Sequence, residues 1–336
     1  MTRFLSLKEA AECLRNGGIV GMPTETVYGL AAVATNEHAI AKIFDAKNRP
    51  TFDPLIVHIP DEEWIAKVAG NIPDEARRLA TAFWPGPLTL ILSKQPHIPF
   101  LVTAGLETVG VRLPSHALAR QLIREVGLPL AAPSANLFGR TSPTTAEHVL
   151  DQLGSRIDGV VDGGPCDVGV ESTIISFATQ FPTLLRHGGI CEEAIRDTLR
   201  TPLHVAVKGI PGTVINSSMQ APGSMESHYC PKTPLYFHDV HCIEDAFEQI
   251  RQATHKNLRA GLLCSGGIVP PDAPVITINL SRDGDLRQVA TGLYGAMRLF
   301  DTHELDLIVA VGVIQEGLGR AINDRLRRAD CTPKKR

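Results

Sequence analysis

The stretch "GMPTETVYGLAA", residues Gly21–Ala32, carries an unusual run of polar side chains for a segment so near the start of a chain. It continues an apolar run, Ile19 to Met22, that predicts a short buried strand. Three hydroxyls and one carboxyl follow before the next glycine, on Thr24, Glu25, Thr26 and Tyr28. A strand that simply stops and turns needs only the usual turn residues, such as glycine, proline or asparagine. The polar run therefore raises the question of which group these side chains serve.

Helix and strand patterns alternate on both sides of this stretch. Ser6 with Glu9 forms a predicted capping box for the helix in "SLKEAAECLRNGG", and Asn36 is the predicted N-cap of the helix in "NEHAIAKIFDAKNR". "PLIVHI" then predicts a strand, and further strands and helices interleave as far as Leu199. Interleaving of this kind indicates an α/β layer structure in which helices cover a sheet.

The length of 336 residues and a break in the pattern both indicate two domains. The break is "GIPGTVINSSMQAPGSMESHYCPKTP", from Gly209 to Pro234, which is rich in proline, glycine and serine and has no periodicity. Beyond it, strands and helices alternate again. We therefore predict a first domain at 1–208, a linker or lid at 209–233 and a smaller, doubly wound α/β domain at 234–336.

The composition argues against several classes of protein. Hydrophobic residues make up 43% of the chain and charged residues 21%, the balance of a soluble globular enzyme. The formal charge of −3 gives no general attraction to nucleic acid or to an anionic membrane. Seven scattered cysteines without a CxxC pair argue against a disulfide framework or a structural zinc site, and no apolar run is long enough to span a bilayer. We therefore expect a cytoplasmic protein without a membrane segment.

Basic side chains recur at the ends of the predicted helices and strands. Lys47 and Arg49 lie in "KNRP" at the end of a helix, Arg112 ends the strand "VGVR", and Arg186 ends the strand "TLLR". Each has a simpler explanation, because a cation complements a helix C-terminus and an isolated arginine is usually a solvated surface charge. Together, the four cations predict a clamp for a polyanion at the edge where open α/β sheets bind ligands.

Small hydroxyl and amide side chains follow two further strands. "AAPSANLFGRTSPTTAEHV" places Ser134, Asn136 and Ser142 ahead of a helix that we expect to begin at Thr144, an arrangement that suits contact with phosphate. "VGVESTIISF" places Ser172 in an otherwise apolar strand. An ordinary capped turn explains the first pattern equally well, and a hydrogen-bonded strand hydroxyl explains the second.

Common catalytic motifs are absent from the sequence. His58 in "LIVHI" fits a hydrogen-bonded core histidine as well as a catalytic base. The chain contains no HExxH motif, no GxSxG elbow and no P-loop. The motifs therefore predict no metal site made by the protein.

Six motifs in register carry a resemblance to a known family: "PTETVYGL", "KNRP…PLIVHI", "PSAN", "GVESTII", "LRHGG" and "HYCPKTPL". With "GLYGAMRLFD" and "GLGRAINDRLRRA" near the C-terminus, they resemble the long form of the threonylcarbamoyl-AMP synthase family. The resemblance covers nearly the whole chain. It implies a YrdC-like domain with a twisted mixed sheet and helices, followed by a smaller Rossmann-like α/β domain.

The resemblance also implies an activity, that of an L-threonylcarbamoyladenylate synthase, which is a nucleotidyltransferase. Such an enzyme makes threonylcarbamoyl-AMP and pyrophosphate from L-threonine, bicarbonate or CO2, and ATP. The downstream tRNA threonylcarbamoyl-transfer machinery then modifies an adenosine beside the anticodon of certain tRNAs. The implied cofactor set is Mg²⁺ accompanying ATP and nothing tightly bound, and any contact with RNA is expected to be weak.

Individual residues take roles from the same resemblance. Lys47 and Arg49 are the implied catalytic pair. The implied L-threonine contacts are Thr26, Tyr28, His58, Arg112 and Ser172. The implied ATP contacts are Lys47, Arg49, Asp53, Thr108, Ser134, Asn136, Ser142, Arg186 and Tyr229. Tyr229 lies in the predicted linker and would close over the site.

Three positions depart from the family pattern. Asp53 stands where asparagine is common, and its carboxylate would repel a polyphosphate unless Mg²⁺ intervened. Ala132 stands where threonine is common, which removes one possible substrate contact, and Ser227 stands where arginine is frequent, so the lid is expected to hold phosphate less firmly. None of these changes removes the predicted clamp.

Two other functions compete with this interpretation. One is a non-catalytic RNA-binding protein, which the acidic balance of charge and the 5% content of aromatic residues disfavour. The other is a different carbamoyl-adenylate enzyme, such as a carbamoyltransferase. Such enzymes usually have additional large domains, for which this chain has no room.

Overall fold

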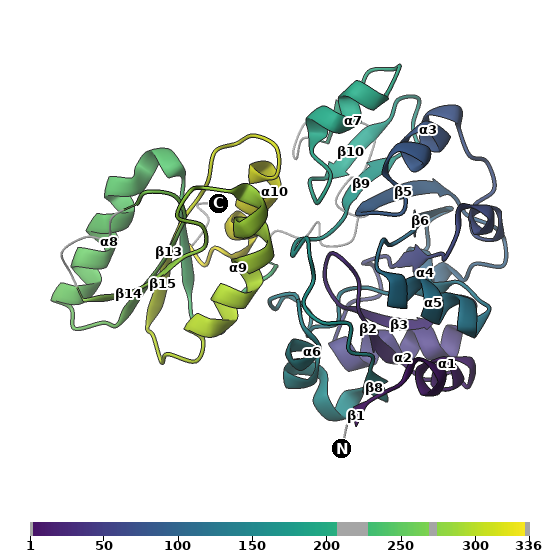
Figure 1. The fold of residues 1–336 in the computed structure, drawn as a ribbon, viewed down its shortest axis with the longest axis horizontal. Helices are drawn as coiled ribbons and strands as arrows, with labels where there is room; N and C mark the ends of the chain where they lie inside the picture. Colours follow the sequence, from purple (N-terminus) through teal and green to yellow (C-terminus); the bar gives the residue numbers. More distant parts are fainter. Residues whose placement is uncertain (1–2, 207–227, 269–273, 333–336) are drawn as a thin grey trace. The chain divides into compact units, whose positions relative to one another are not determined.

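The computed structural model of the chain describes residues 3–206, 228–268 and 274–332. These residues form two compact units (Figure 1). The first unit comprises the described residues up to 206 except two short segments, 139–141 and 168–170, which belong to the second unit with everything from residue 228 onward. Most of the predicted linker, Ser227 included, lies outside the described residues.

The first unit is built on a mixed sheet, which in the described part of the chain has eleven strands. Their order is β1-β8-β2-β3-β7-β4-β6-β5-β9-β10-β11, and parallel and antiparallel neighbours alternate irregularly. The strands are β1 (Arg3–Phe4), β2 (Val20–Met22), β3 (Gly29–Val33), β4 (Ile56–His58), β5 (Leu88–Ser93), β6 (Thr108–Arg112), β7 (Leu130–Ala131), β8 (Gly159–Val160), β9 (Thr173–Ser176), β10 (Thr183–Arg186) and β11 (His204–Val205). The expected mixed α/β fold is confirmed.

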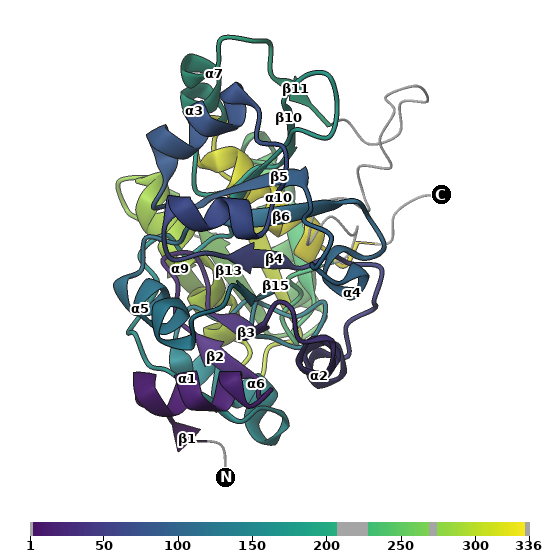
Figure 2. The same cartoon turned by 90° about the vertical axis from the view of Figure 1, so that its right-hand side faces the viewer.

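Helices cover both faces of this sheet because its central strands are apolar on both sides. In β3, Leu30 and Ala32 belong to the core that includes α2, α3 and α4, whereas Ala31 and Val33 belong to a second core with α1 and α5. In Figure 2 the strands accordingly lie between α5 on one side and α2 with α4 on the other. The helices are α1 (Leu7–Arg15), α2 (Glu37–Lys47), α3 (Asp74–Phe83), α4 (Phe100–Thr103), α5 (Ala117–Val126), α6 (Ala146–Leu153) and α7 (Glu192–Thr198), with short 3₁₀ turns at η1 (Glu62–Lys67) and η2 (Gly154–Arg156).

The first helices begin where their capping residues place them. The Ser6 side chain accepts from the N–H of Glu9, whose carboxylate accepts from the N–H of Ser6 in return, so the predicted capping box is confirmed. Asn36 caps α2 through the N–H of Ala39, also as predicted. The prediction for α6 was wrong by one residue, because its N-cap is Thr145 and not Thr144.

The opening polar stretch forms the loop of a β-hairpin that the sequence patterns did not predict. β2 pairs with β3 in antiparallel register, with Val20 opposite Ala31 and Met22 opposite Gly29. β3 reads "GLAAV", which has no alternation because both of its faces are buried. Residues 23–28 are therefore held at both ends by the centre of the sheet.

In the residues that the structure describes, the second unit has a four-stranded, all-parallel sheet in the order β12-β15-β13-β14. Its strands are β12 (Leu235–His238), β13 (Ala260–Cys264), β14 (Val275–Asn279) and β15 (Leu307–Val311). Helix α8 (Ile243–His255), preceded by η4 (Val240–Cys242), packs on one face, and α9 (Leu286–Phe300) and α10 (Gly319–Ala329) lie on the other (Figure 1). Helices on both faces of a parallel sheet are the doubly wound arrangement that was predicted.

Candidate active site

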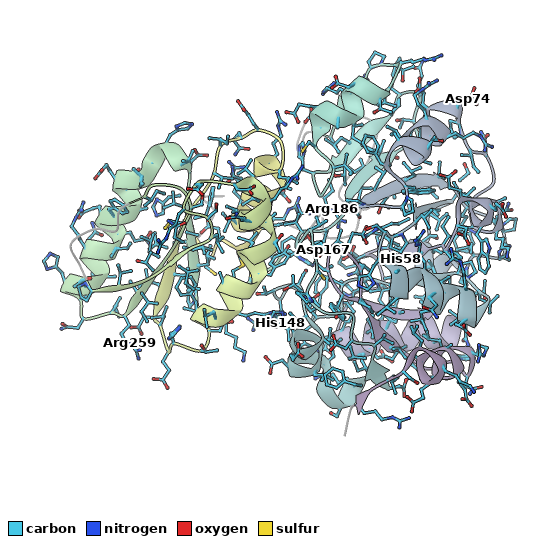
Figure 3. All side chains as sticks on the ribbon, in the orientation of Figure 1. His58, Asp74, His148, Asp167, Arg186 and Arg259 are labelled. Carbon is cyan, nitrogen blue, oxygen red and sulfur yellow. The ribbon has the colours of Figure 1, made fainter. Side chains whose placement is uncertain are left out.

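Several side chains that could take part in binding or catalysis lie along one line across the sheet of the first unit. Strand register pairs Leu130 of β7 with His58 of β4, His58 with Arg112 of β6, and Arg112 with Thr89 of β5. It continues from Thr89 to Ile174 of β9 and from Ile174 to Arg186 of β10. These six residues therefore lie side by side across the sheet. Figure 3 labels His58 and Arg186, and it shows both inside the first unit, unlike Asp74 at its outer side.

The hairpin loop is folded by Thr24. Its hydroxyl accepts hydrogen bonds from the N–H groups of Thr26 (3.2 Å) and Val27 (3.3 Å) and donates to the carbonyl of Val27 (2.6 Å). Such a turn, closed by a threonine side chain, curls the chain within three residues. As a result the consecutive side chains of Glu25 and Thr26 both reach the same group, the guanidinium of Arg112.

Arg112 is held from two sides by this loop. Its Nη1 donates to Oγ1 of Thr26 at 2.8 Å, and its Nη2 forms an ion pair with Oε1 of Glu25 at 2.8 Å. Arg112 and Glu25 are 4% and 3% exposed. Burial raises the pKa of Glu25, but the adjacent Arg112 outweighs burial, so the net pKa lies below its usual value and the carboxyl is ionised. Glu25 was not among the predicted site residues, because its partner is 87 residues away in the sequence.

His58 is a neutral buried histidine next to Arg112. It is 3% exposed, and its Nδ1 lies 3.2 Å from the carbonyl oxygen of Ile56. Burial, together with the positive charge of Arg112, lowers the pKa of His58 to about 3. At neutral pH the imidazole is therefore uncharged, and it can donate or accept a hydrogen bond in the site without adding charge.

The shifted pKa of His58 should make stability depend on pH. The unfolded chain has the ordinary histidine pKa of about 6.5, so between that value and the folded value the unfolded state binds a proton that the folded state does not. We expect stability to fall by up to about 1.4 kcal/mol per pH unit from this group as pH decreases through that window. Urea unfolding of His58→Gln should show a shallower pH slope than the wild type, whereas the exposed His38→Gln should not; equal slopes for all three would contradict this assignment.

Ser172 and Arg186 form the far end of the site. The Ser172 hydroxyl is 2.8 Å from the Thr89 hydroxyl, and Arg186 donates to the Ser172 hydroxyl from Nη2 (3.1 Å) and to its carbonyl from Nε (3.1 Å). Ser172 lies one residue before β9 and is 1% exposed. Thr89 was not predicted, since a threonine in an apolar strand gives no signal of its own.

Gly188 of the "LRHGG" motif approaches the backbone of the Ser172 segment. A Cβ at Gly188 would lie 2.3 Å from the carbonyl oxygen of Glu171 and 2.4 Å from the nitrogen of Thr173. We expect Gly188→Ala to displace Ser172, to destabilise the protein by about 1–3 kcal/mol and to lower turnover. Gly70→Ala, which adds a Cβ where no atom lies within 4 Å, is the matched control. Melting and turnover measurements that leave the two variants alike would contradict this packing role.

A second group of cations lies at the end of α2. Lys47 is fully buried, and its Nζ donates to the carbonyls of Ser134 and Asn136, both at 2.5 Å. Burial, assisted by the charge of Arg49, holds the pKa of Lys47 well below its usual value. Arg49 donates to the carbonyl of Pro54 and pairs with the carboxylate of Asp53 at 2.9 Å.

These contacts bear on the prediction that Lys47, Arg49, Arg112 and Arg186 form a clamp for a polyanion. Arg49, Arg112 and Arg186 face inward and are at most 7% exposed, so the alternative of solvated surface charges was wrong. Two of the three nevertheless pair with carboxylates, Arg49 with Asp53 and Arg112 with Glu25. Asp53, predicted to contact ATP, is therefore in this structure the ion partner of a neighbouring cation.

Backbone hydrogen bonds of Tyr28 connect the hairpin loop that contacts Arg112 with the segment whose carbonyls accept from Lys47. The Tyr28 N–H donates to the carbonyl of Pro143, and its carbonyl accepts from the N–H of Ala135. Nearby, the Ser142 hydroxyl donates to Oε1 of Glu171 at 2.7 Å, which places the loop of Ser142 beside the segment of Ser172.

The side chains of three predicted site residues, Tyr28, Thr108 and Tyr229, are not part of the contacts described above. The Tyr28 hydroxyl accepts from the N–H of Gly163 and donates to the carbonyl of Gly164, so it holds a turn of the protein itself. Thr108 begins β6, four residues and about 13 Å along the strand from Arg112, although on the same face.

Tyr229 belongs to the second unit. It has φ 68°, is 1% exposed, and packs between Tyr294, at 5.7 Å between ring centroids, and the guanidinium of Arg325, at 5.3 Å. Its predicted contact with ATP stays a prediction.

The described ranges hold no group of three or more His, Cys, Asp or Glu side chains that could bind a metal ion. In the same ranges no helix is both long and apolar enough to cross a membrane.

Two family patterns match adjacent parts of the chain. The one described as "Telomere recombination" matches residues 12–188, and the one described as "Threonylcarbamoyl-AMP synthase, C-terminal domain" matches residues 190–330.

Whole-length relatives agree with these matches. The threonylcarbamoyl-AMP synthase of Bacillus subtilis (strain 168) is 44% identical, over 96% of this chain and 92% of that protein. The threonylcarbamoyl-AMP synthase of Pyrococcus abyssi is 38% identical, over 96% of this chain and 93% of that protein. The crystal structure of P. abyssi Sua5 complexed with L-threonine superposes with a TM-score of 0.88 at 37% identity, over 96% of this chain and 93% of that chain. This chain therefore belongs to the threonylcarbamoyl-AMP synthase family.

Proposed function

We propose that this chain makes threonylcarbamoyl-AMP and pyrophosphate from L-threonine, bicarbonate or CO2, and ATP. The main observation behind the proposal is that the guanidinium of Arg112 is buried between two hydroxyl side chains. Thr26 accepts a hydrogen bond from it, and Thr89 lies opposite Arg112 in the strand register. A guanidinium suits a carboxylate, and hydroxyls suit a hydroxyl-bearing side chain. The crystal structure of the P. abyssi relative, in which L-threonine is bound, supports the same choice of substrate.

The chemistry proposed needs no nucleophile from the protein. The threonine ammonium loses a proton to solvent, the resulting amine adds to CO2, and loss of a second proton from nitrogen to solvent gives a carbamate, whose oxygen attacks the α-phosphorus of ATP. The bond from that phosphorus to the bridging oxygen breaks, and pyrophosphate leaves. Catalysis of such a step depends on alignment and on neutralising spread negative charge. The buried cations Lys47, Arg49 and Arg186 are the groups that we assign to the phosphates.

The sites of ATP and Mg²⁺ follow from the same assignment. Ser134, Asn136 and Ser142 would lie beside the phosphates, on the loop that Lys47 orders through two carbonyls. Since Asp53 is paired with Arg49, we propose that Mg²⁺ is held mainly by the triphosphate and not by a protein carboxylate. Tyr229 stays a predicted ATP contact, and the product would pass to the tRNA threonylcarbamoyl-transfer machinery in the cytoplasm.

The competing functions have less support. The Bacillus relative, a threonylcarbamoyl-AMP synthase, matches along nearly the full length of both chains, which favours the proposed function over that of another carbamoyl-adenylate enzyme. A non-catalytic RNA-binding role gives no reason for a guanidinium buried between hydroxyls inside the sheet.

The test is pyrophosphate release by the full chain. We expect release only when L-threonine, bicarbonate and ATP are all present. L-2-aminobutyrate, which lacks the hydroxyl, should be rejected by about 10⁴-fold, whereas L-serine, which lacks only a methyl group, should be the harder competitor to exclude. Release without threonine, or none under any condition, would rule out the proposed function.

A further inference from the structure

The Glu25–Arg112 pair has bonding capacity that the protein leaves unused. Nε of Arg112 and Oε2 of Glu25 are both buried, and neither makes a well-directed hydrogen bond in the described part of the chain, although the backbone N–H groups of Glu25 and Ser115 lie near the carboxylate. Nη2 and Oε1, although 2.8 Å apart, form an ion pair and not a well-directed hydrogen bond. A buried polar atom left without a partner costs about 1–3 kcal/mol, so an unused donor beside an unused acceptor points to a ligand.

The two unused groups match the two charges of an α-amino acid. Nε of Arg112 can donate to a carboxylate, and Oε2 of Glu25 can accept from an ammonium. In an α-amino acid the ammonium and the carboxylate are both attached to the α-carbon. They are therefore as close to each other as the side chains of Glu25 and Arg112 are. The pair has no net charge, and neither has the zwitterion of a neutral amino acid, so binding would bury no excess charge.

Building on the proposed function, we propose that Glu25 is the specificity-determining residue that binds the α-ammonium of the amino-acid substrate while Arg112 binds its carboxylate. The site thereby selects the zwitterion over a hydroxy acid of the same shape. Threonine would then bind before its nitrogen is carboxylated, because carboxylation removes the ammonium that Glu25 holds.

Binding calorimetry without ATP tests this role. The ligands are L-threonine and (2S,3R)-2,3-dihydroxybutanoate, in which a hydroxyl replaces the amino group. The wild type should prefer threonine, and Glu25→Gln should lower the ratio of the two affinities by about 10- to 100-fold, mainly through weaker threonine binding. Glutamine retains the shape of the side chain and an acceptor for Arg112. The exposed Glu37→Gln, which removes the same charge from the first turn of α2, should leave the ratio unchanged.

The outcomes separate the two proposals. If Glu25→Gln weakens both ligands equally, Glu25 only supports Arg112 and the inference fails while the proposed function stands. The inference fails in the same way if the ratio equals that of the wild type. If the wild type binds neither ligand, the proposed function itself fails.

A second measurement needs no variant and applies even if Glu25→Gln does not fold. In the wild type, threonine affinity should fall as alkaline pH removes the proton from the ligand's ammonium, and affinity for the hydroxy acid should stay constant. The neighbouring titratable groups His58 and Cys166 change charge outside this range, because the pKa of His58 is about 3 and burial raises the pKa of Cys166 to about 12. Parallel pH profiles for the two ligands would overturn the inference.

Discussion

Arg112→Ala is expected to lower kcat/KM for L-threonine by about 100-fold or more and to destabilise the first unit by about 3–5 kcal/mol. The loss of activity follows from the proposed carboxylate contact. The loss of stability follows from Glu25, whose buried carboxylate would lose its ion partner.

Activity and stability can be separated by a second substitution. Arg112→Met with Glu25→Gln removes both charges, so it should recover most of the lost stability and none of the activity. Arg124→Ala is the matched control, since it breaks an exposed pair with Asp61 and should change stability by at most about 1 kcal/mol. Urea unfolding and pyrophosphate release measure the two effects. Near-normal turnover in Arg112→Ala would contradict the assignment of this residue.

Arg49→Ala is expected to have the second largest effect, on the nucleotide side of the site. It removes a buried cation and, with it, the ion pair that Arg49 forms with the carboxylate of Asp53, at the place where we propose that the triphosphate binds. We expect kcat/KM for ATP to fall by about 100-fold or more, because a lost attraction is compounded by a new repulsion. Threonine binding without ATP should be unchanged.

The double variant Arg49→Ala with Asp53→Asn distinguishes these two causes. It lacks the same cation but also lacks the repelling charge, so its KM for ATP should be lower than that of Arg49→Ala alone. Initial rates at varied ATP concentration measure the difference. If both variants show the same KM, Asp53 does not face the phosphates, and if Arg49→Ala turns over at the normal rate, Arg49 is not part of the site.

The four cations of the predicted polyanion clamp are buried and held in fixed positions, unlike cations on an exposed surface. Each arginine is buried and is oriented by a carboxylate or a carbonyl, and Lys47 is committed to two carbonyls. Fixed donors of this kind are already arranged before the substrate binds, which is the condition under which charge stabilisation is most effective. The cost is that most substitutions in the site will disturb folding as well as catalysis.

Local patterns in the sequence predicted the elements of this protein well. The capping box of Ser6 and Glu9 and the N-cap of Asn36 were predicted correctly. These features depend on contacts between residues a few positions apart, so a short stretch of sequence contains all that determines them. Of the residues that the family resemblance implied, the fold brings Thr26, His58 and Arg112 together, and likewise Ser172 with Arg186.

The tertiary structure alone decided how those residues are paired. β3 was missed because both of its faces are buried, and burial on both faces depends on helices distant in the sequence. Glu25 became the partner of Arg112, and Thr89 the partner of Ser172, only through strand register across the sheet. Register joins residues more than eighty positions apart, and no local pattern records it. The sequence by itself thus determined which side chains are available, and the sheet determined which of them meet.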